Sequence, residues 1–322
     1  MLNRRILRVK AFKILYSYVS SGSTSIMSAE KDLLLSCEKC RDLYLLMLNL
    51  ARALRNAEGD SIAARRNKFL PTEEDINPNM KFFGNLFVET LDNNMDFVKI
   101  CEKKGLLWKE HDIFVRRLLK SVSSKEYFMK YMESPERSMA DDCGVFIRIY
   151  ENELEDNDEL QQILEDASLY WVDDLGYVLG YIIKTLKGLR KGETFSVPPL
   201  FQSDSESAKS SEGIEDDKAY VLKLLDYAMA NYDRLFKMIA SSTANWDSDR
   251  LVSTDAALII LGLSEAAVFP QIPVKVTINE YVEISKYYST SNSRIFVNGL
   301  LDRLIQKGLE DGSIVKSGKG LL

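Results

Sequence analysis

Apolar residues recur every three or four positions along most of this chain of 322 residues, and almost no stretch alternates with a period of two. The first pattern is typical of amphipathic helices and the second of half-buried strands. We therefore predict an all-α protein. The predicted helices span residues 3–20, 29–58, 79–104, 110–120, 124–133, 137–153, 158–190, 215–241, 247–268, 276–288 and 293–310. Only 194–202 and 313–316 have extended character.

A serine-rich, acidic stretch interrupts the helical pattern: SDSESAKSSEG, residues 203–213, which closely follows the helix-breaking pair Pro198-Pro199. Such a composition buries little apolar surface, so it predicts a loop. We place a domain boundary there. It separates an N-terminal helical domain, 1–205, from a C-terminal helical bundle, 206–322.

The first predicted helix is unusually basic, because residues 1–29 contain five Lys and Arg residues and no Asp or Glu. A helical projection groups Arg5, Arg8, Phe12 and Tyr16 beside the apolar stripe. This combination is suited to single-stranded nucleic acid, because cations bind the backbone phosphates and aromatic rings stack on unpaired bases. The alternatives are a solvated helix face and a helix that lies on an acidic membrane.

Composition narrows the class of protein further. A net charge of −6, with 46% apolar and 28% charged residues, is typical of a soluble globular protein and argues against indiscriminate nucleic-acid binding. No apolar run approaches the length of about 20 residues that a membrane helix needs, so we expect a cytoplasmic protein. Residues 151–174 contain ten acidic and no basic residues, which predicts a solvated helix face or a docking surface for a basic partner.

The sequence contains few candidates for catalytic or metal-binding residues. The chain has four cysteines and one histidine, His111. A zinc site from Cys37, Cys40, Cys101 and His111 is conceivable, but free, buried cysteines are the favoured interpretation. No nucleophile–base set and no nucleotide-binding or metalloprotease motif is present. We predict no enzyme, no cofactor and no metal.

Several strings of residues resemble one known family. They are RRILRVKAFKILYSY at 4–18, DDKAYVLKLLDYAMANYDRLFKMI at 216–239, DAALIILGLSEA at 255–266, IPVKVTINEYVEISKYYST at 272–290 and SRIFVNGLLDRL at 293–304. In this order they resemble the NusB family of transcription antitermination factors. About 130 residues are covered in this way. Residues 25–205 have little counterpart in a short family member, so the chain resembles a long form with a large helical insertion.

The resemblance implies a fold and a function. The fold is a NusB-like pair of helical bundles with an enlarged N-terminal part, in which residues 1–20 complete the core. The function is non-catalytic binding of the boxA element of ribosomal RNA leader transcripts, as a heterodimer with the small-subunit ribosomal protein NusE, within the antitermination complex on RNA polymerase. A homodimer is an alternative when the partner is absent.

Two other functions remain as alternatives. One is a protein-interaction scaffold that has lost RNA binding. The other is an RNA cytosine methyltransferase, because such enzymes carry the same helical module. A methyltransferase also needs an α/β domain with a glycine-rich turn, which this sequence lacks.

The resemblance also implies site residues. Those expected at the RNA are Arg4, Arg5, Arg8, Tyr16, Lys275, Arg294 and Phe296, and Asp255 is expected at the ribosomal protein. Ile295 stands where the family often has lysine, so we expect Arg294 to supply that charge. Asn292 stands where relatives can carry aspartate, which removes a negative charge from the RNA face.

The pair Asn298-Gly299 is locally the strongest hairpin signal in the chain. The apolar spacing on both sides is nevertheless helical, so we predict a helix through the pair. A glycine within a helix costs about 1 kcal/mol relative to alanine. Close packing against a neighbouring helix is the expected reason for Gly299.

Overall fold

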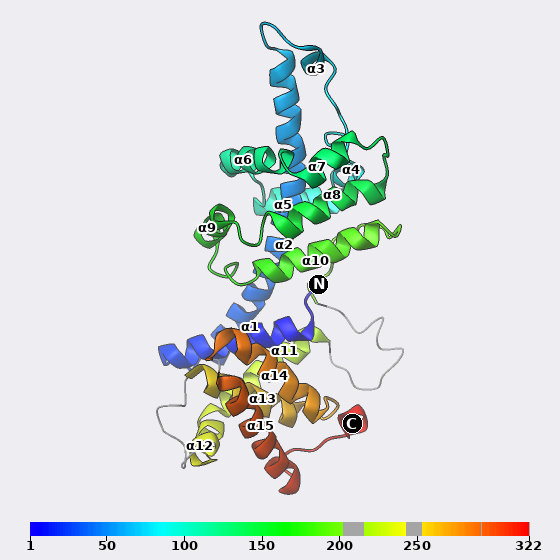
Figure 1. Ribbon diagram of the computed structural model, residues 1–322. Coiled ribbons are helices and arrows are strands. Elements are labelled where there is room, and N and C mark those ends of the chain that lie inside the picture. The colour runs from blue at the N-terminus through cyan, green and yellow to red at the C-terminus, as the bar shows by residue number, and fades with distance from the viewer. Residues whose placement is uncertain (202–215, 243–252, 291, 322) are drawn as a thin grey trace. The chain divides into compact units, whose positions relative to one another are not determined.

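The computed structural model describes residues 1–201, 216–242, 253–290 and 292–321. Within these residues every regular element is a helix and no strand occurs (Figure 1), which confirms the all-α prediction. The stretch 313–316 and the described part of 194–202 accordingly form no strand. The predicted loop at 203–213 and the predicted boundary at 205 lie outside the described residues.

The chain forms two compact units, one of Met1–Cys37 with Pro199–Leu322 and one of Glu38–Pro198. The first thirty-seven residues thus share a unit with the C-terminal part of the chain. Our sequence-based division assigned only residues 1–20 to that bundle. The helix α2 (Ile26–Arg66) explains the difference, because it runs on without a break through the boundary at residue 37.

The first unit is a bundle built around α13. The central helix α13 spans Ser253–Val268, and the other helices are α1 (Arg4–Ser21), the start of α2, α11 (Asp217–Ala230), α12 (Tyr232–Ser242), α14 (Val274–Tyr288), α15 (Ser293–Glu310) and the short η3 (Gly318–Leu321). The central helix α13 contacts α1, α11, α12, α14 and α15. Residues 255–266 of α13 are all buried, as expected for a helix that is apolar on every side.

Both ends of α1 are fixed by local interactions. The amino group of Met1 donates to the carbonyl of Pro199 at 2.8 Å. The side chain of Asn3 accepts a hydrogen bond from the Ile6 N–H and begins the helix. Gly22, with φ of 69°, ends it in the left-handed conformation that glycine adopts without strain. The helix therefore has a defined start and end beside the helices that follow residue 199.

The second unit consists of shorter helices around the remainder of α2. They are α3 (Glu73–Ile76), α4 (Leu86–Asn93), α5 (Met95–Lys104), η1 (Lys109–His111), α6 (Asp112–Ser123), α7 (Glu126–Glu133), α8 (Met139–Asn152), α9 (Asp158–Ala167) and α10 (Leu175–Leu189). Its core contains the ring of Phe146, which stacks on Phe82 and meets the ring of Phe87 edge to face. The buried hydroxyl of Tyr150 donates to the carbonyl of Met47 at 2.8 Å, which ties α8 to α2.

Three of the predicted helices are interrupted in the structure. The segment 79–104 contains α4 and α5, 158–190 contains α9 and α10, and 215–241 contains α11 and α12. Polar residues mark two of the breaks. Asn94 accepts a hydrogen bond from the Phe97 N–H and so begins α5, and Asn231 ends α11. Apolar periodicity continues across such breaks, so it does not reveal them.

Gly299 lies within α15, as predicted, but our expectation of close packing there is wrong. The residue is exposed, and a Cβ atom at this position would meet no atom within 4 Å. The close approach is at Gly262 on α13 instead. A Cβ atom there would lie 2.6 Å from Leu301 Cδ2 and 3.3 Å from the ring of Tyr281.

Candidate functional site

A buried ionic cluster joins α1 to the other helices of the first unit. At its centre is Glu265 of α13, which is fully buried. Arg8 donates to this carboxylate from Nε at 2.6 Å and from Nη2 at 3.1 Å. The hydroxyls of Thr277, at 2.7 Å, and Tyr220 also donate to it. Four donors from three helices thus converge on one carboxylate.

The protonation of this cluster is fixed by its charges. Burial is the largest single influence on the pKa of Arg8 and lowers it, but the electrostatic effects of Glu265 and Tyr220 and the hydrogen bond to Glu265 together outweigh burial, so the pKa is raised. Burial raises the pKa of the Tyr220 hydroxyl well above its usual value, and the charge of Glu265 raises it further. Arg8 is therefore charged and Tyr220 neutral at any physiological pH. Because Arg8 is only 4% exposed, it offers no surface to RNA, and the predicted direct contact does not fit this geometry.

The two outer arginines of α1 are more accessible. Arg5, with a side chain 55% exposed, donates to Glu280 of α14 at 2.7 and 2.9 Å. The hydrogen bond from Arg5 is the main cause of a lowered pKa at Glu280. Arg4, 31% exposed, lies 3.4 Å from Asp217 and over the ring of Tyr220. Arg8 Nη1 also donates to the Glu280 carboxylate, at 3.4 Å, so Glu280 faces both Arg5 and Arg8.

An aromatic cluster lies further along α1. The ring centroid of Phe12 is 6.2 Å from that of Tyr16 and 5.4 Å from that of Tyr288 at the end of α14. The ammonium group of Lys13 lies 5.3 Å from the Tyr288 ring. Tyr16 and Tyr288 are half-buried. This combination of rings and a cation is the kind of surface on which unpaired bases stack.

Asp255 has a structural position. It is 2% exposed, and its two carboxylate oxygens accept hydrogen bonds from the hydroxyls of Ser289 and Ser293. Ser293 is the first residue of α15 and Ser289 directly follows α14. The carboxylate therefore ties the start of α13 to the α14–α15 connection. A direct contact between Asp255 and a ribosomal protein, as predicted, does not fit this burial.

The remaining predicted residues fall at the two ends of α14. Arg294 is exposed and Phe296 half-buried in the first turn of α15, and Ile295 between them is 70% exposed. Lys275 is exposed in the first turn of α14. Tyr288 follows it by thirteen positions, which corresponds to about 20 Å of helix. Lys275 thus lies at the opposite end of α14 from the aromatic cluster.

Comparison with known proteins identifies the family. The sequence model of the NusB family matches residues 198–306. A protein of Myxococcus xanthus named transcription antitermination protein NusB is 30% identical over 129 residues, which are 36% of this chain and 92% of that protein. The chain belongs to the NusB family. Its second unit, 38–198, lies before the matched region and forms an additional helical part.

Two further NusB proteins match over shorter lengths. The protein of Desulforudis audaxviator is 34% identical over 92 residues, which are 29% of this chain and 67% of that protein. The protein of Chloroherpeton thalassium is 34% identical over 105 residues, 33% of this chain, and the chain spans about half of its length. Both carry the name transcription antitermination protein NusB. No solved structure matches the chain.

Sequence reasoning missed several residues of this NusB-family site. Glu265 is the one charged residue in α13 after Asp255, and an isolated charge in an apolar run is a signal of a buried partner. Tyr288 is the last residue of α14, and the adjacent cation and rings of Lys286, Tyr287 and Tyr288 were a sequence signal for it. No sequence pattern predicted that these residues contact α1, which lies more than 250 residues earlier in the chain.

Other chemistry in the described residues is limited. No group of three or more potential metal ligands occurs among them. The four cysteines are buried, and burial raises the pKa of the Cys101 thiol to about 12, which keeps it protonated. Within the same residues, no helix has the length and apolar character needed to cross a membrane.

Proposed function

We propose that this NusB-family protein binds boxA-type leader RNA of ribosomal RNA operons as a heterodimer with the ribosomal protein NusE. One observation carries the proposal: α1, far upstream of the family match, packs on α11 and α13 of the matched region. The basic helix therefore belongs to the same compact unit as α15. Both elements that the resemblance assigns to RNA are held on one module.

The accessible residues of this module suggest how the RNA is held. Arg5 and Arg294 are exposed cations that suit backbone phosphates, and Arg4 is a weaker candidate because it lies against Tyr220. Tyr16 and Phe296 are half-buried rings on which unpaired bases can stack. Lys275 contacts a more distant phosphate, since it lies about 20 Å of helix from the aromatic cluster. Selectivity for one RNA sequence comes from the stacked bases.

The same proposal includes the cellular context. The protein acts without catalysis in the cytoplasm, where the heterodimer joins the antitermination complex on RNA polymerase. Free protein binds boxA RNA weakly, and NusE strengthens that binding. The expected contact surface for NusE is on the first unit, because the relatives match that unit.

The test is fluorescence anisotropy with labelled boxA RNA and a scrambled RNA, in the presence of NusE. The Arg5→Glu/Arg294→Glu double variant should weaken boxA binding by at least about tenfold, because each reversal removes a phosphate contact. The control is Arg66→Glu, which reverses the charge of an exposed residue in the second unit and should leave the affinity for boxA RNA unchanged. Equal affinity of the wild-type protein for both RNAs would contradict the proposal.

One observation favours a second candidate function, an interaction scaffold without RNA binding. All three arginines of α1 have a carboxylate partner within the unit: Asp217, Glu280 and Glu265. The positive charge of the helix is therefore largely neutralised by the fold. This candidate is supported if NusE is bound but the arginine reversals change no RNA affinity.

A further inference from the structure

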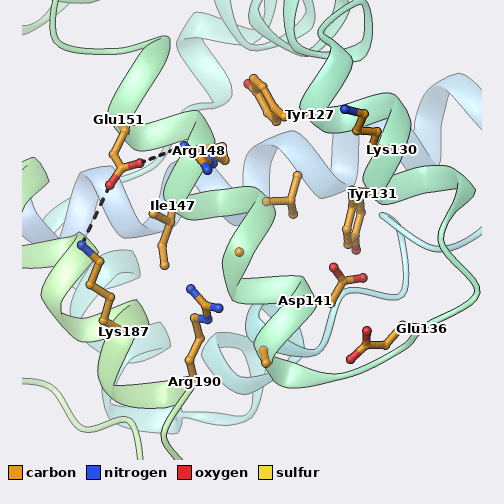
Figure 2. A pocket seen from close by; sticks show the side chains of 13 residues that line it. Tyr127, Lys130, Tyr131, Glu136, Asp141, Ile147, Arg148, Glu151, Lys187 and Arg190 are labelled. Atoms are coloured by element: carbon orange, nitrogen blue, oxygen red, sulfur yellow. Dashed lines mark ion pairs between the residues drawn. The ribbon is translucent and has the colours of Figure 1, made fainter.

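The second unit contains a cleft of about 700 Å³ between α7, α8 and α10 (Figure 2). Its volume falls within the range of about 300–1,000 Å³ that is typical of small-molecule sites. All its lining residues lie between Tyr127 and Arg190, outside the region that matches the NusB family. The role of this cleft is therefore separate from the boxA proposal.

Three cations line one side of the cleft. Arg148 extends from α8, Lys187 from α10 and Arg190 from just beyond the end of α10 (Figure 2). A single carboxylate, Glu151, lies 4.0 Å from both Arg148 and Lys187. That separation exceeds the 2.7–2.9 Å of a charge-assisted hydrogen bond. The side chains of Arg148 and Lys187 are 63% and 57% exposed, and Arg190 is exposed as well, so all three present N–H groups to an anion in the cleft.

The carboxylates on the other side of the cleft are already engaged. Asp141 accepts a hydrogen bond from Lys81 at 2.6 Å. Glu136 accepts one from the Ser138 hydroxyl at 3.1 Å. The negative charge of Asp141 is thus compensated within the fold. The side formed by α8 and α10 retains an excess of cations over carboxylates, which favours an anionic ligand.

An aromatic ring and a glycine also line the cleft. Tyr127 is half-buried in the wall formed by α7, and its hydroxyl donates to Glu153 at 3.2 Å, which fixes the ring. Lys130 lies one turn further along the same helix. Gly144 of α8 also lines the cleft, and a Cβ atom at this position would meet nothing within 4 Å. The cleft therefore has room for a flat group between the ring and the cations.

We propose that this cleft binds a nucleotide, with its phosphate at Arg148, Lys187 and Arg190 and its base toward Tyr127. Guanidinium groups bind phosphate oxygens with paired hydrogen bonds, and a tyrosine ring accepts any base by stacking. The nucleotide is either part of a single-stranded RNA or a free mononucleotide, since both offer the same phosphate and base. Binding at this site extends the RNA contacts of the chain to its second unit or gives it a small-molecule ligand.

The test uses the full chain with the Arg5→Glu/Arg294→Glu background, so that binding to the first unit does not contribute. The probes are a labelled ten-nucleotide RNA without boxA, measured by anisotropy, and AMP and ATP, measured by calorimetry. Arg148→Gln/Arg190→Gln should weaken binding by about tenfold or more. Lys184→Gln, an exposed lysine of α10 outside the cleft, is the matched control and should bind as the background protein does.

A steric pair of variants separates loss of fold from loss of site. Gly144→Phe should fill the cleft and abolish binding, whereas Gly144→Ala should retain both binding and thermal stability, because a Cβ atom fits there. Binding of the RNA alone assigns the cleft to an RNA segment, and binding of AMP or ATP assigns it to a free nucleotide. The proposal is overturned if the probes do not bind, or if their affinity is the same in the cleft variants and the control. Neither result depends on whether the wild-type protein recognises boxA.

Discussion

At the scale of single residues, Glu265 decides how α1 is held. It lies in the most apolar helix of the first unit and is reached by Arg8, Tyr220 and Thr277. A buried ion pair gains little net stability over an apolar contact, but removal of one partner leaves the other charge buried and unpaired. The cluster therefore specifies the position of α1 rather than adding much stability.

Glu265→Gln should consequently be strongly destabilising. The loss of the charge opposite Arg8 is expected to reduce the free energy of unfolding of the first unit by about 3–5 kcal/mol. The control is Glu283→Gln, which removes the exposed partner of Lys286 on α14 and should cost about 1 kcal/mol or less. Urea unfolding of the two variants measures the difference. Equal losses would contradict the central position of Glu265.

Asp226 on α11 gives the first unit a dependence on pH. Burial, and then the charge and hydrogen bond of Glu30, raise the pKa of Asp226 to about 6, and its Oδ1 is buried without a hydrogen-bond partner. The pKa of an unfolded aspartate is about 3.9, so the folded state binds the proton more tightly. The resulting stabilisation is fully present below about pH 4 and is lost as the pH rises through about 6.

Asp226→Asn keeps a neutral group beside Glu30 at every pH. The melting temperature of this variant should exceed that of the wild-type protein at pH 8, and the gain should shrink at pH 5, where Asp226 retains its proton. Thermal unfolding at the two pH values measures the gain. Asp233→Asn, at an exposed position of α12, is the control and should give no such gain. A gain that is independent of pH would contradict the raised pKa of Asp226.

At the scale of helices, packing depends on how closely neighbouring helices approach one another. The three C-terminal helices meet where Gly262 of α13 lies against Leu301 of α15 and Tyr281 of α14. Gly299 on α15 lies in the open instead. The sequence motif led us to predict close packing at Gly299 rather than at Gly262. A sequence gives the type of a residue but not which atoms lie opposite it.

The two glycines should respond oppositely to alanine. Gly262→Ala would place a Cβ atom 2.6 Å from Leu301 Cδ2, so buried side chains must shift at a cost of about 1–3 kcal/mol. Gly299→Ala adds a methyl group in free space and should stabilise α15 by up to about 1 kcal/mol through helix propensity. Urea unfolding compares them directly. Stabilisation by both substitutions would contradict the close contact at Gly262.

At the scale of the whole molecule, each unit has its own core. Leu7 and Leu258 are fully buried in the first unit, and Phe146 and Leu154 are fully buried in the second. The chain passes between the units twice, once within α2 after Cys37 and once between Pro198 and Pro199. Separate cores predict that damage to one unit spreads little to the other.

Leu7→Ala provides the test, with Leu154→Ala as the matched variant in the second unit. A buried leucine truncated to alanine costs about 2–5 kcal/mol, so hydrogen exchange in α11, α13 and α15 should accelerate in the first variant. Exchange in α4 and α8 should remain as in the wild-type protein. Leu154→Ala should show the reverse pattern. Faster exchange in both units of either variant would indicate a single cooperative core.

The sequence by itself determined the helical class and the family. Apolar spacing specifies helices because a helix buries one stripe of its surface, and the strings at 255–304 identify NusB relatives because their order is specific. It did not locate the helix breaks at Asn94 and Asn231, because a local side-chain hydrogen bond ends a helix without disturbing the apolar period.

Only the tertiary structure decided what the charged residues do. The sequence marked Arg4, Arg5 and Arg8 alike as an RNA-binding set, but their carboxylate partners lie more than 200 residues away along the chain. The fold buries Arg8 against Glu265 and leaves Arg5 accessible, and it likewise places Asp255 inside. The reason is physical: whether a charge faces solvent or a partner depends on which distant helix covers it, and no local pattern contains that information.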